Sequence, residues 1–226
     1  KMSGAYMLDS LYRGTVLREG YPRNDIFRQK PDLSMKERAG FAGKTLLTYF
    51  PTYRGIFNQV ERQEYMETLS ANLALWDSQL NDDEILLIKL HPFLHGSESF
   101  DGYRHIRAFP TDWDTYEGLN LCNILITDYS SVSWDVLYQN KPTLFYQFDL
   151  DKYNEAHGSY IDMKTDLFGD RAETLDQLLD SLEKTIQNNF RMEPKYEKMQ
   201  QEYFQFEDHE HSRHICEEIK KWMKRK

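Results

Sequence analysis

The chain has 226 residues, 40% of them hydrophobic and 29% charged, which is typical of a globular protein and excludes a disordered, collagen-like or low-complexity chain. At roughly 150 residues per domain, this length allows one large domain or one and a half. The net charge of −9 repels polyanions over most of the surface, so we expect no nucleic-acid partner, and a phosphate ligand needs a local site.

Residues 1–43 carry weak hydrophobic periodicity and two turn signals, and we interpret them as a linker segment. From Lys44 onward, β-prone apolar runs alternate with helical patterns. The predicted strands are residues 45–50, 84–90, 123–127 and 143–147, with a further short apolar run at 106–109. The predicted helices between them are residues 62–80, 116–121 and a segment that ends at Tyr138.

Near-continuous apolar strands separated by helices indicate a parallel sheet that is buried on both faces. We therefore predict an α/β fold with one doubly wound, Rossmann-like domain at residues 44–190. Beyond residue 149 the pattern predicts helices at residues 174–188, 194–206 and 210–226. We expect residues 191–226 to pack on this domain or to cross to a partner domain.

In such sheets, ligands bind at the carboxyl ends of the strands, where loops and helix N-termini meet. The strongest candidate there is Asp128 with the two serines that follow it. Ser130 or Ser131 could cap the next helix, which would stabilise it by about 1 kcal/mol. The same hydroxyls could instead bind a phosphate together with the N–H groups of the helix. The spacing alone leaves both interpretations open.

His91 follows an apolar strand and precedes Pro92, which favours an extended conformation at the strand end. Its imidazole could accept a proton from an attacking hydroxyl or stabilise phosphate oxygens. It could also be a structural histidine that is bonded to a loop carbonyl. Arg54, which follows the first strand, could bind a phosphate or pair with a surface acid.

The sequence favours neither a metal site nor a dinucleotide cofactor. His91 and His95 have the spacing of two ligands on a helix, but the neighbouring proline and glycine disfavour a helix there. The three histidines at positions 209, 211 and 214 lack a strand-anchored carboxylate in the sequence pattern. No G-x-G-x-x-G, Walker A or G-x-S-x-G sequence occurs. We therefore predict no metal and no cofactor.

The sequence predicts a cytoplasmic protein. Its longest nearly apolar run, residues 85–90, is far shorter than the roughly 20 residues of a membrane-spanning helix. Residues 1–14 do not resemble a secretory signal, and two cysteines allow no disulfide framework. The basic residues 220–226 either complement a helix dipole or contact anionic lipid, which would place the protein on the inner face of the cell membrane.

Five sequence stretches follow one another in a characteristic order. They are residues 20–25 (GYPRND), 51–54 (PTYR), 89–93 (KLHPF), 126–132 (ITDYSSV), and the stretch from 141–142 (KP) to 149–153 (DLDKY). Between residues 20 and 213, their order and spacing resemble the CDP-glycerol glycerophosphotransferases, the family of the teichoic acid primases and polymerases and of related capsule polymerases.

The resemblance implies a GT-B architecture, in which two Rossmann-like domains enclose the active site, and it matches this chain to the C-terminal, donor-binding half. It implies transfer of glycerol phosphate, or of a related polyol phosphate, from a CDP-linked donor such as CDP-glycerol. The acceptor would be a hydroxyl of a teichoic acid or capsule polymer or of a lipid-linked primer, and CMP would be released.

The resemblance also suggests roles for single residues. His91 matches the family's active-site histidine in this half of the architecture, and Ser130 and Ser131 match its pyrophosphate-contacting serines. Three more residues lie in matching or adjacent loops and are assigned to donor binding: Arg54, Asp112 and Asp128.

Two departures from the family pattern limit these expectations. The family's N-terminal domain, with its Trp-His-Gly-Thr-Pro-type motif and second essential histidine, is absent from these 226 residues, so we expect it as a partner that activity requires. The pattern also differs at residues 168–170 and at Asp208-His209, which leaves the polyol open. A nucleotide-sugar glycosyltransferase of GT-B type, with Asp112 or Asp149 near the sugar, and a non-catalytic nucleotide-binding half of a split or truncated enzyme stay as alternatives.

Overall fold

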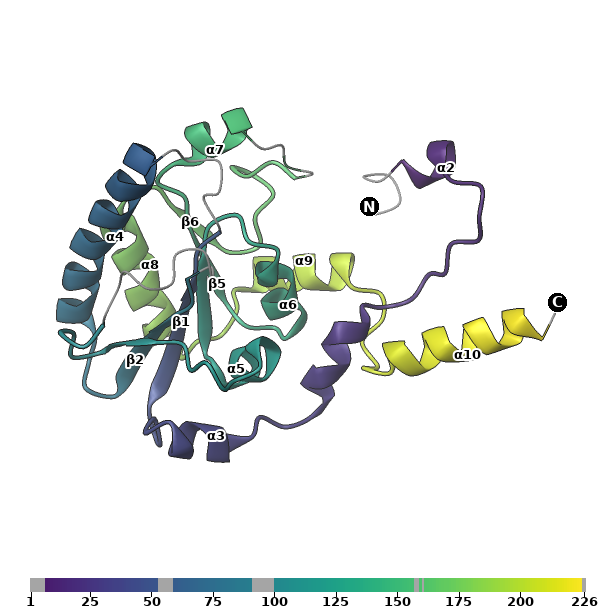
Figure 1. Ribbon diagram of the computed structural model, residues 1–226, viewed down its shortest axis with the longest axis horizontal. Helices are drawn as coiled ribbons and strands as arrows, with labels where there is room; N and C mark the ends of the chain where they lie inside the picture. The colour runs from purple at the N-terminus through teal and green to yellow at the C-terminus, as the bar shows by residue number, and fades with distance from the viewer. Residues whose placement is uncertain (1–6, 53–58, 91–99, 157–158, 160, 225–226) are drawn as a thin grey trace.

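The computed structural model describes residues 7–52, 59–90, 100–156, 159 and 161–224. Its centre is a six-stranded sheet with the strand order β3-β2-β1-β4-β5-β6 (Figure 1), and every neighbouring pair is parallel. The strands are β1 (Thr45–Phe50), β2 (Glu84–Ile88), β3 (Ile106–Ala108), β4 (Ile124–Thr127), β5 (Thr143–Tyr146) and β6 (Asp170–Ala172). The predicted α/β class and parallel sheet are therefore confirmed.

Side chains alternate between two cores, because successive residues of a strand point to opposite faces. On one face, Leu47 and Tyr49 of β1 pack against α4 (Gln59–Gln79) and α8 (Leu175–Gln187). On the other face, Leu46 and Phe50 pack against α3 (Leu33–Arg38), α5 (Thr115–Leu121) and α6 (Val132–Tyr138). The sheet is thus covered on both faces (Figure 1), which explains why its strands are almost uninterrupted apolar runs.

The helices predicted after β1, β3 and β4 are confirmed as α4, α5 and α6. The predicted limits of α4 and α5 and the predicted end of α6 agree with the structure within three residues. Three short elements in the predicted linker were not foreseen: α2 (Leu8–Leu11), the 3-10 helix η1 (Pro22–Arg28) and α3. Met35 of α3 and Phe41 after it are buried in the core. The domain limits at residues 43/44 and 190/191 stay a prediction. Strand β6 and α7 (Leu150–Ala156) were also not foreseen.

The last two helices are α9 (Pro194–Tyr203) and α10 (His211–Met223). Helix α9 packs beside α6 and β5 through Tyr196, Met199 and Tyr203. Helix α10 extends away from the sheet, as does the segment that carries α2 (Figure 1). Within the described residues, no helix combines the length and the apolar character needed to cross a membrane.

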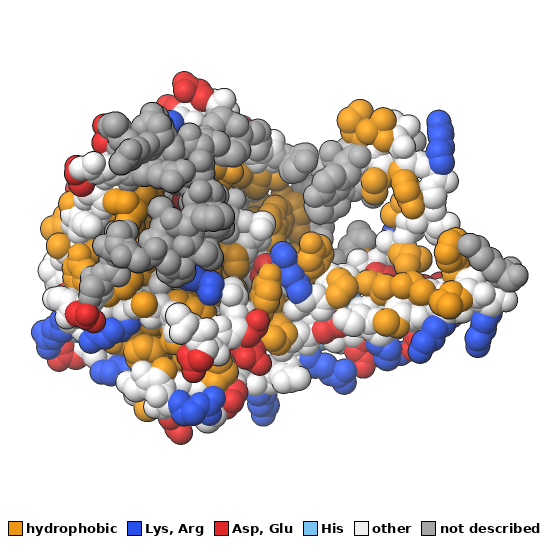
Figure 2. Space-filling view, in the orientation of Figure 1, with side chains coloured by type: hydrophobic (Ala, Val, Ile, Leu, Met, Phe, Trp, Pro, Cys, Tyr) orange, Lys and Arg blue, Asp and Glu red, His pale blue; other side chains and the backbone are white. Residues whose placement is uncertain are grey.

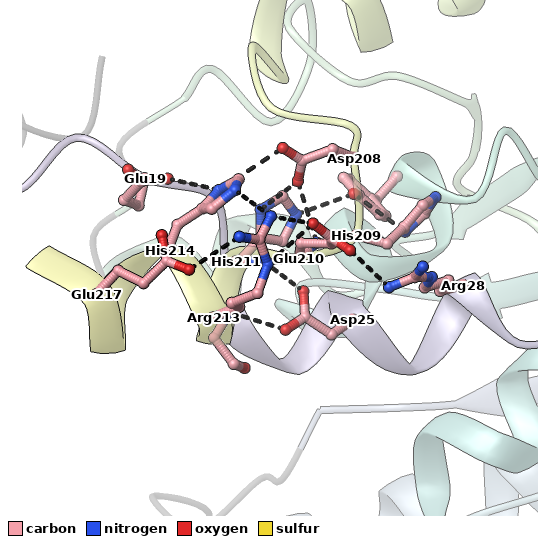
Figure 3. A network of polar contacts seen from close by, with 12 residues as sticks. Glu19, Asp25, Arg28, Asp208, His209, Glu210, His211, Arg213, His214 and Glu217 are labelled. Carbon is pink, nitrogen blue, oxygen red and sulfur yellow. Dashed lines mark hydrogen bonds and ion pairs between the residues drawn. The ribbon is translucent and has the colours of Figure 1, made fainter.

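A polar network joins η1 to the beginning of α10 (Figure 3). The Asp25 carboxylate accepts hydrogen bonds from the backbone N–H groups of His211 (2.9 Å) and Ser212 (2.8 Å), and so caps a helix that lies 186 residues away in the chain. The Tyr138 hydroxyl lies 3.0 Å from His211 Nε2 and 3.2 Å from His209 Nδ1. Because Tyr138 belongs to α6, the network also anchors η1 and α10 to the sheet domain.

Candidate functional site

The loops that follow the strands meet at the carboxyl edge of the sheet. From β1 the chain continues to β2 and β3 on one side of the sheet, and from β4 it continues to β5 and β6 on the other side. The strand order therefore reverses between β1 and β4, which is the topological switch point of the sheet. This is the place where doubly wound sheets of this strand order bind ligands. Phe50 at the end of β1 pairs with Thr127 at the end of β4, so the loops that begin at Pro51 and Asp128 leave the sheet side by side.

Asp128 connects these two loops. Its carboxylate accepts hydrogen bonds from the Thr52 backbone N–H (2.9 and 3.1 Å) and from Thr52 Oγ1 (2.6 Å). Asp128 is 1% exposed. A buried carboxylate needs such donors to offset the loss of water. The Gln147 side chain also donates to the Asp128 carbonyl (3.1 Å). This geometry favours a positioning role for Asp128, because a second anion beside the carboxylate would be repelled.

Ser130 and Ser131 follow Asp128 and Tyr129 and directly precede α6. Ser131 is exposed, stands at the N-cap position and forms no side-chain cap hydrogen bond. Ser130 Oγ is 3.5 Å from the Val132 N–H, at the limit of a hydrogen bond. Capping therefore does not account for the hydroxyl of Ser131. Of the two interpretations that the sequence left open, the structure favours a hydroxyl that is available to a ligand.

Aromatic and polar side chains surround these serines. The Tyr129 ring stacks on Tyr153 with 3.7 Å between ring centroids, and its hydroxyl donates to Asp149 (3.0 Å). A small cavity of about 30 Å³ lies beside Ser130, and a more open one of about 300 Å³ shares its lining residues Ile161 and Met163. The cavity beside Ser130 has room for about one water molecule, and the larger one is lined by residues 154, 159 and 161–164, which follow β5 in the chain.

Asp112 is not brought together with the serines. It is exposed in the turn between β3 and α5. Because β3 is an edge strand and lies three positions from β4, the two loops leave the sheet roughly 14 Å apart at the usual strand spacing. A ligand that contacts both must span that distance.

The predicted residues His91 and Arg54 lie outside the described residues. The strands that precede them, β2 and β1, end at the same edge as β4. Lys89, at the end of β2, is described: its Nζ lies 4.6 Å from the centre of the Phe109 ring, and burial lowers its pKa. A cation therefore stands on this edge beside the β2 loop.

Two further pairs at this edge were not identified from the sequence. One is the pair of Thr52, in the stretch 51–54, with Asp128. The other is the pair of Arg23, in the stretch 20–25, with Asp135, to which the Arg23 Nε donates at 2.7 Å. No local pattern indicates either pair, because their members are 76 and 112 residues apart.

The architecture has known counterparts. The fold is similar to that of the wall teichoic acid polymerase TagF, with a TM-score of 0.75 and 23% identity over 97% of this chain and 55% of that chain. It is also similar to MnaA of Staphylococcus aureus solved with UDP, with a TM-score of 0.57 and 14% identity over 98% of this chain and 58% of that chain. At these identities the similarity concerns the fold alone. Together with the sheet order, it defines a Rossmann-like domain of the GT-B type.

Sequence comparison identifies the family. The sequence matches the family described as CDP-Glycerol:Poly(glycerophosphate) glycerophosphotransferase over residues 5–221, and the chain belongs to it. It is 28% identical to a teichoic acid glycerol-phosphate transferase of Staphylococcus aureus and 26% identical to a teichoic acid poly(glycerol phosphate) polymerase of Bacillus spizizenii. Each alignment covers 92% of this chain and 54% of the relative, so the chain spans about half the length of these relatives. The predicted family is confirmed.

Proposed function

We propose that this chain binds the CDP-linked donor in the transfer of glycerol phosphate, or of a related polyol phosphate, to a hydroxyl of a teichoic acid polymer, with release of CMP. The observation that carries the proposal is family membership over residues 5–221. The names of the two relatives, a glycerol-phosphate transferase and a poly(glycerol phosphate) polymerase, support the same reaction class.

In this proposal the donor lies at the carboxyl edge of the sheet. Ser130 and Ser131 bind its diphosphate, and Asp128 holds the loop after β1 through Thr52. Arg54 neutralises the charge that develops during in-line attack on the phosphorus, and His91 acts as acid, base or charge stabiliser. Asp112 contacts a part of the ligand that lies away from the serines. Positioning and electrostatics would supply most of the catalysis, as is usual for phosphoryl transfer.

A second α/β domain would complete the active site in this proposal. Support comes from the surface of the terminal segments, where hydrophobic side chains line α10 (Figure 2). Trp222 is 56% exposed and Met223 68%, and in the N-terminal segment Leu11 is 74% exposed. Apolar residues in such a row usually face a partner. Lys220 and Lys221 in the last turn would also suit contact with an anionic membrane surface at the inner face of the cell membrane.

Calorimetric titration of this chain with CDP-glycerol tests the proposal, with UDP-glucose as the competing ligand class. We expect binding of CDP-glycerol and weaker binding of UDP-glucose. Ser131→Ala should weaken CDP-glycerol binding by roughly tenfold, the effect of one hydrogen bond to a charged group, with little change in stability because Ser131 forms no cap. Ser78→Ala, an exposed serine near the end of α4, is the matched control and should bind normally.

Preference for UDP-glucose would favour the nucleotide-sugar glycosyltransferase instead. A Ser131→Ala chain that binds CDP-glycerol as tightly as the Ser78→Ala chain would remove the serine from the site. Binding of neither nucleotide would contradict donor binding by this chain.

A further inference from the structure

The guanidinium group of Arg23 lies at the same end of the sheet as the candidate site, and the proposed function gives it no role. Arg23 belongs to η1, and its Nε donates to Asp135 Oδ1 of α6 at 2.7 Å. The Asp135 side chain is 3% exposed and the Arg23 side chain 32%. Burial raises the pKa of Asp135, while Arg23 acts in the opposite direction. The pair is therefore half buried, with the cation on its outer side.

Two tyrosine rings hold the guanidinium from the sides. The Arg23 guanidinium carbon lies 4.3 Å from the centre of the Tyr21 ring and 5.6 Å from that of Tyr116, both within the range of cation–π attraction. Within the described part of the chain, Nε is the nitrogen that donates to a carboxylate, and the guanidinium also forms a side-chain hydrogen bond with Tyr116. An arginine that is fixed by Asp135 and two tyrosines still has the outer side of its guanidinium fork for a phosphate.

The fold places this fork at the carboxyl edge of the sheet. Tyr116 lies in the first turn of α5 and Asp135 in the first turn of α6, and both helices follow strands that end at this edge. Ser131 precedes Asp135 by four residues, so the two lie on the same face of the helical turn. Arg23, which bonds to Asp135, therefore lies at the beginning of α6, the same end at which Ser131 is exposed.

The rest of η1 is fixed firmly enough to preorganise Arg23. Asp25 caps α10, and Arg28 Nη1 donates to Glu210 Oε1 at 2.9 Å (Figure 3). Asn24 is 2% exposed, between these two anchors and Arg23. The segment thus reaches the site as a braced element that would lose little entropy on ligand binding.

We propose that Arg23 is a further donor-binding residue, whose terminal amino groups hydrogen-bond to a phosphate of the CDP-linked donor beside Ser131. This inference rests on the proposed function. A purely structural role, in which Arg23 neutralises the buried Asp135 and does nothing else, is the competing explanation.

Titration calorimetry with CDP-glycerol and with inorganic pyrophosphate tests this, alongside thermal unfolding of each variant. Arg23→Gln should weaken binding of both ligands by about tenfold or more, the loss expected for a charged hydrogen-bond donor. Arg38→Gln, an exposed arginine of α3 that donates to Ser34, is the matched control and should bind within about twofold of the unaltered chain. The double variant Arg23→Gln/Asp135→Asn removes both charges, so it should regain stability without regaining affinity.

The double variant separates the two explanations even if Arg23→Gln alone folds poorly. Affinity that returns with stability in the double variant would overturn the proposal, as would normal binding by Arg23→Gln. If the unaltered chain binds pyrophosphate but not CDP-glycerol, the proposed donor fails. The pyrophosphate affinities of the same variants then still decide whether Arg23 binds phosphate. If the unaltered chain binds neither, both proposals fail.

Discussion

Asp128 shows how one side chain can serve a site without touching its ligand. The hydrogen bonds from Thr52 fix the first residues after β1, and the bond from the Gln147 side chain to the Asp128 carbonyl fixes Asp128 beside the end of β5. A carboxylate with these partners determines where the loop toward Arg54 starts. Its contribution to donor binding, in our proposal, is the position of that loop.

Replacing Asp128 by Asn should therefore act first on stability. The amide oxygen can replace Oδ1 and keep both Thr52 donors, but the NH2 group then replaces Oδ2 and lies against the Thr52 N–H, and the buried negative charge that these donors bind is lost. We expect the free energy of unfolding to fall by about 1–3 kcal/mol in urea denaturation. Asp112→Asn, an equivalent change in an exposed turn, should stay within about 0.5 kcal/mol. Equal unfolding midpoints for the two variants would contradict the positioning role.

At the residue scale, the sequence predicted the features that depend on residues close together in the chain. The step from β4 to Ser130 and Ser131 was visible because an apolar run ends in polar residues and a helix follows. Two pairs could not be recognised in this way. The sheet order brings Thr52 to Asp128, and the packing of η1 against α6 brings Arg23 to Asp135. The use of Ser131 as a cap could not be decided either, since it depends on a side-chain rotamer and not on spacing.

At the scale of elements, long periodic segments were predicted well and short ones were missed. Helix α8 begins with a capping box from Thr174 and Gln177 and has a strongly amphipathic pattern, so its limits agree with the prediction within one residue. Strand β6 has three residues, of which Ala172 alone is buried, too few for a periodic signal. Helix α3 buries one residue, Met35, and its place under the sheet is set by tertiary contact.

The cap on α10 leads to an element-scale prediction about pH. Burial acts to raise the pKa of Asp25, but hydrogen bonds from Ser212 and His211 outweigh it, and the pKa is lowered in the folded state. A carboxylate whose pKa is lowered by folding contributes stability above its unfolded value. That contribution is lost as the pH falls through the folded value.

Asp25→Ala should therefore lower the free energy of unfolding by about 1 kcal/mol at pH 7, the usual effect of a lost cap. The difference from the unaltered chain should be smaller at pH 3 than at pH 7, because the unfolded chain already binds a proton at Asp25 below its ordinary pKa of 3.8, while the folded carboxylate binds one only at lower pH. Urea denaturation at the two pH values measures it. Asp180→Ala, at an exposed position of α8, should show no difference at either pH. A deficit of Asp25→Ala that is as large at pH 3 as at pH 7 would rule out the charged cap.

At the scale of the whole molecule, we expect donor binding and catalytic turnover to have different structural requirements. Among the described residues, several candidates for donor binding lie at the carboxyl edge of the sheet. The chain spans about half the length of the two relatives named above. Exposed apolar residues on α10 and on the N-terminal segment leave a surface that a second domain could cover. A site of the GT-B type is closed by two domains, so a single half should hold a ligand but should not exclude water from the reacting phosphorus.

We therefore expect this chain to bind CDP-glycerol and to release CMP at least about a hundredfold more slowly than a protein in which it is joined to a second α/β domain. A factor of this size corresponds to the loss of one acid–base or charge-stabilising group. The measurement is CMP release in the presence of a polymer acceptor. In the joined protein, His91→Ala should reduce CMP release by a similar factor, whereas Ser78→Ala should leave it unchanged. Equal rates for the isolated chain and the joined protein would mean that the donor-binding half carries the complete catalytic machinery.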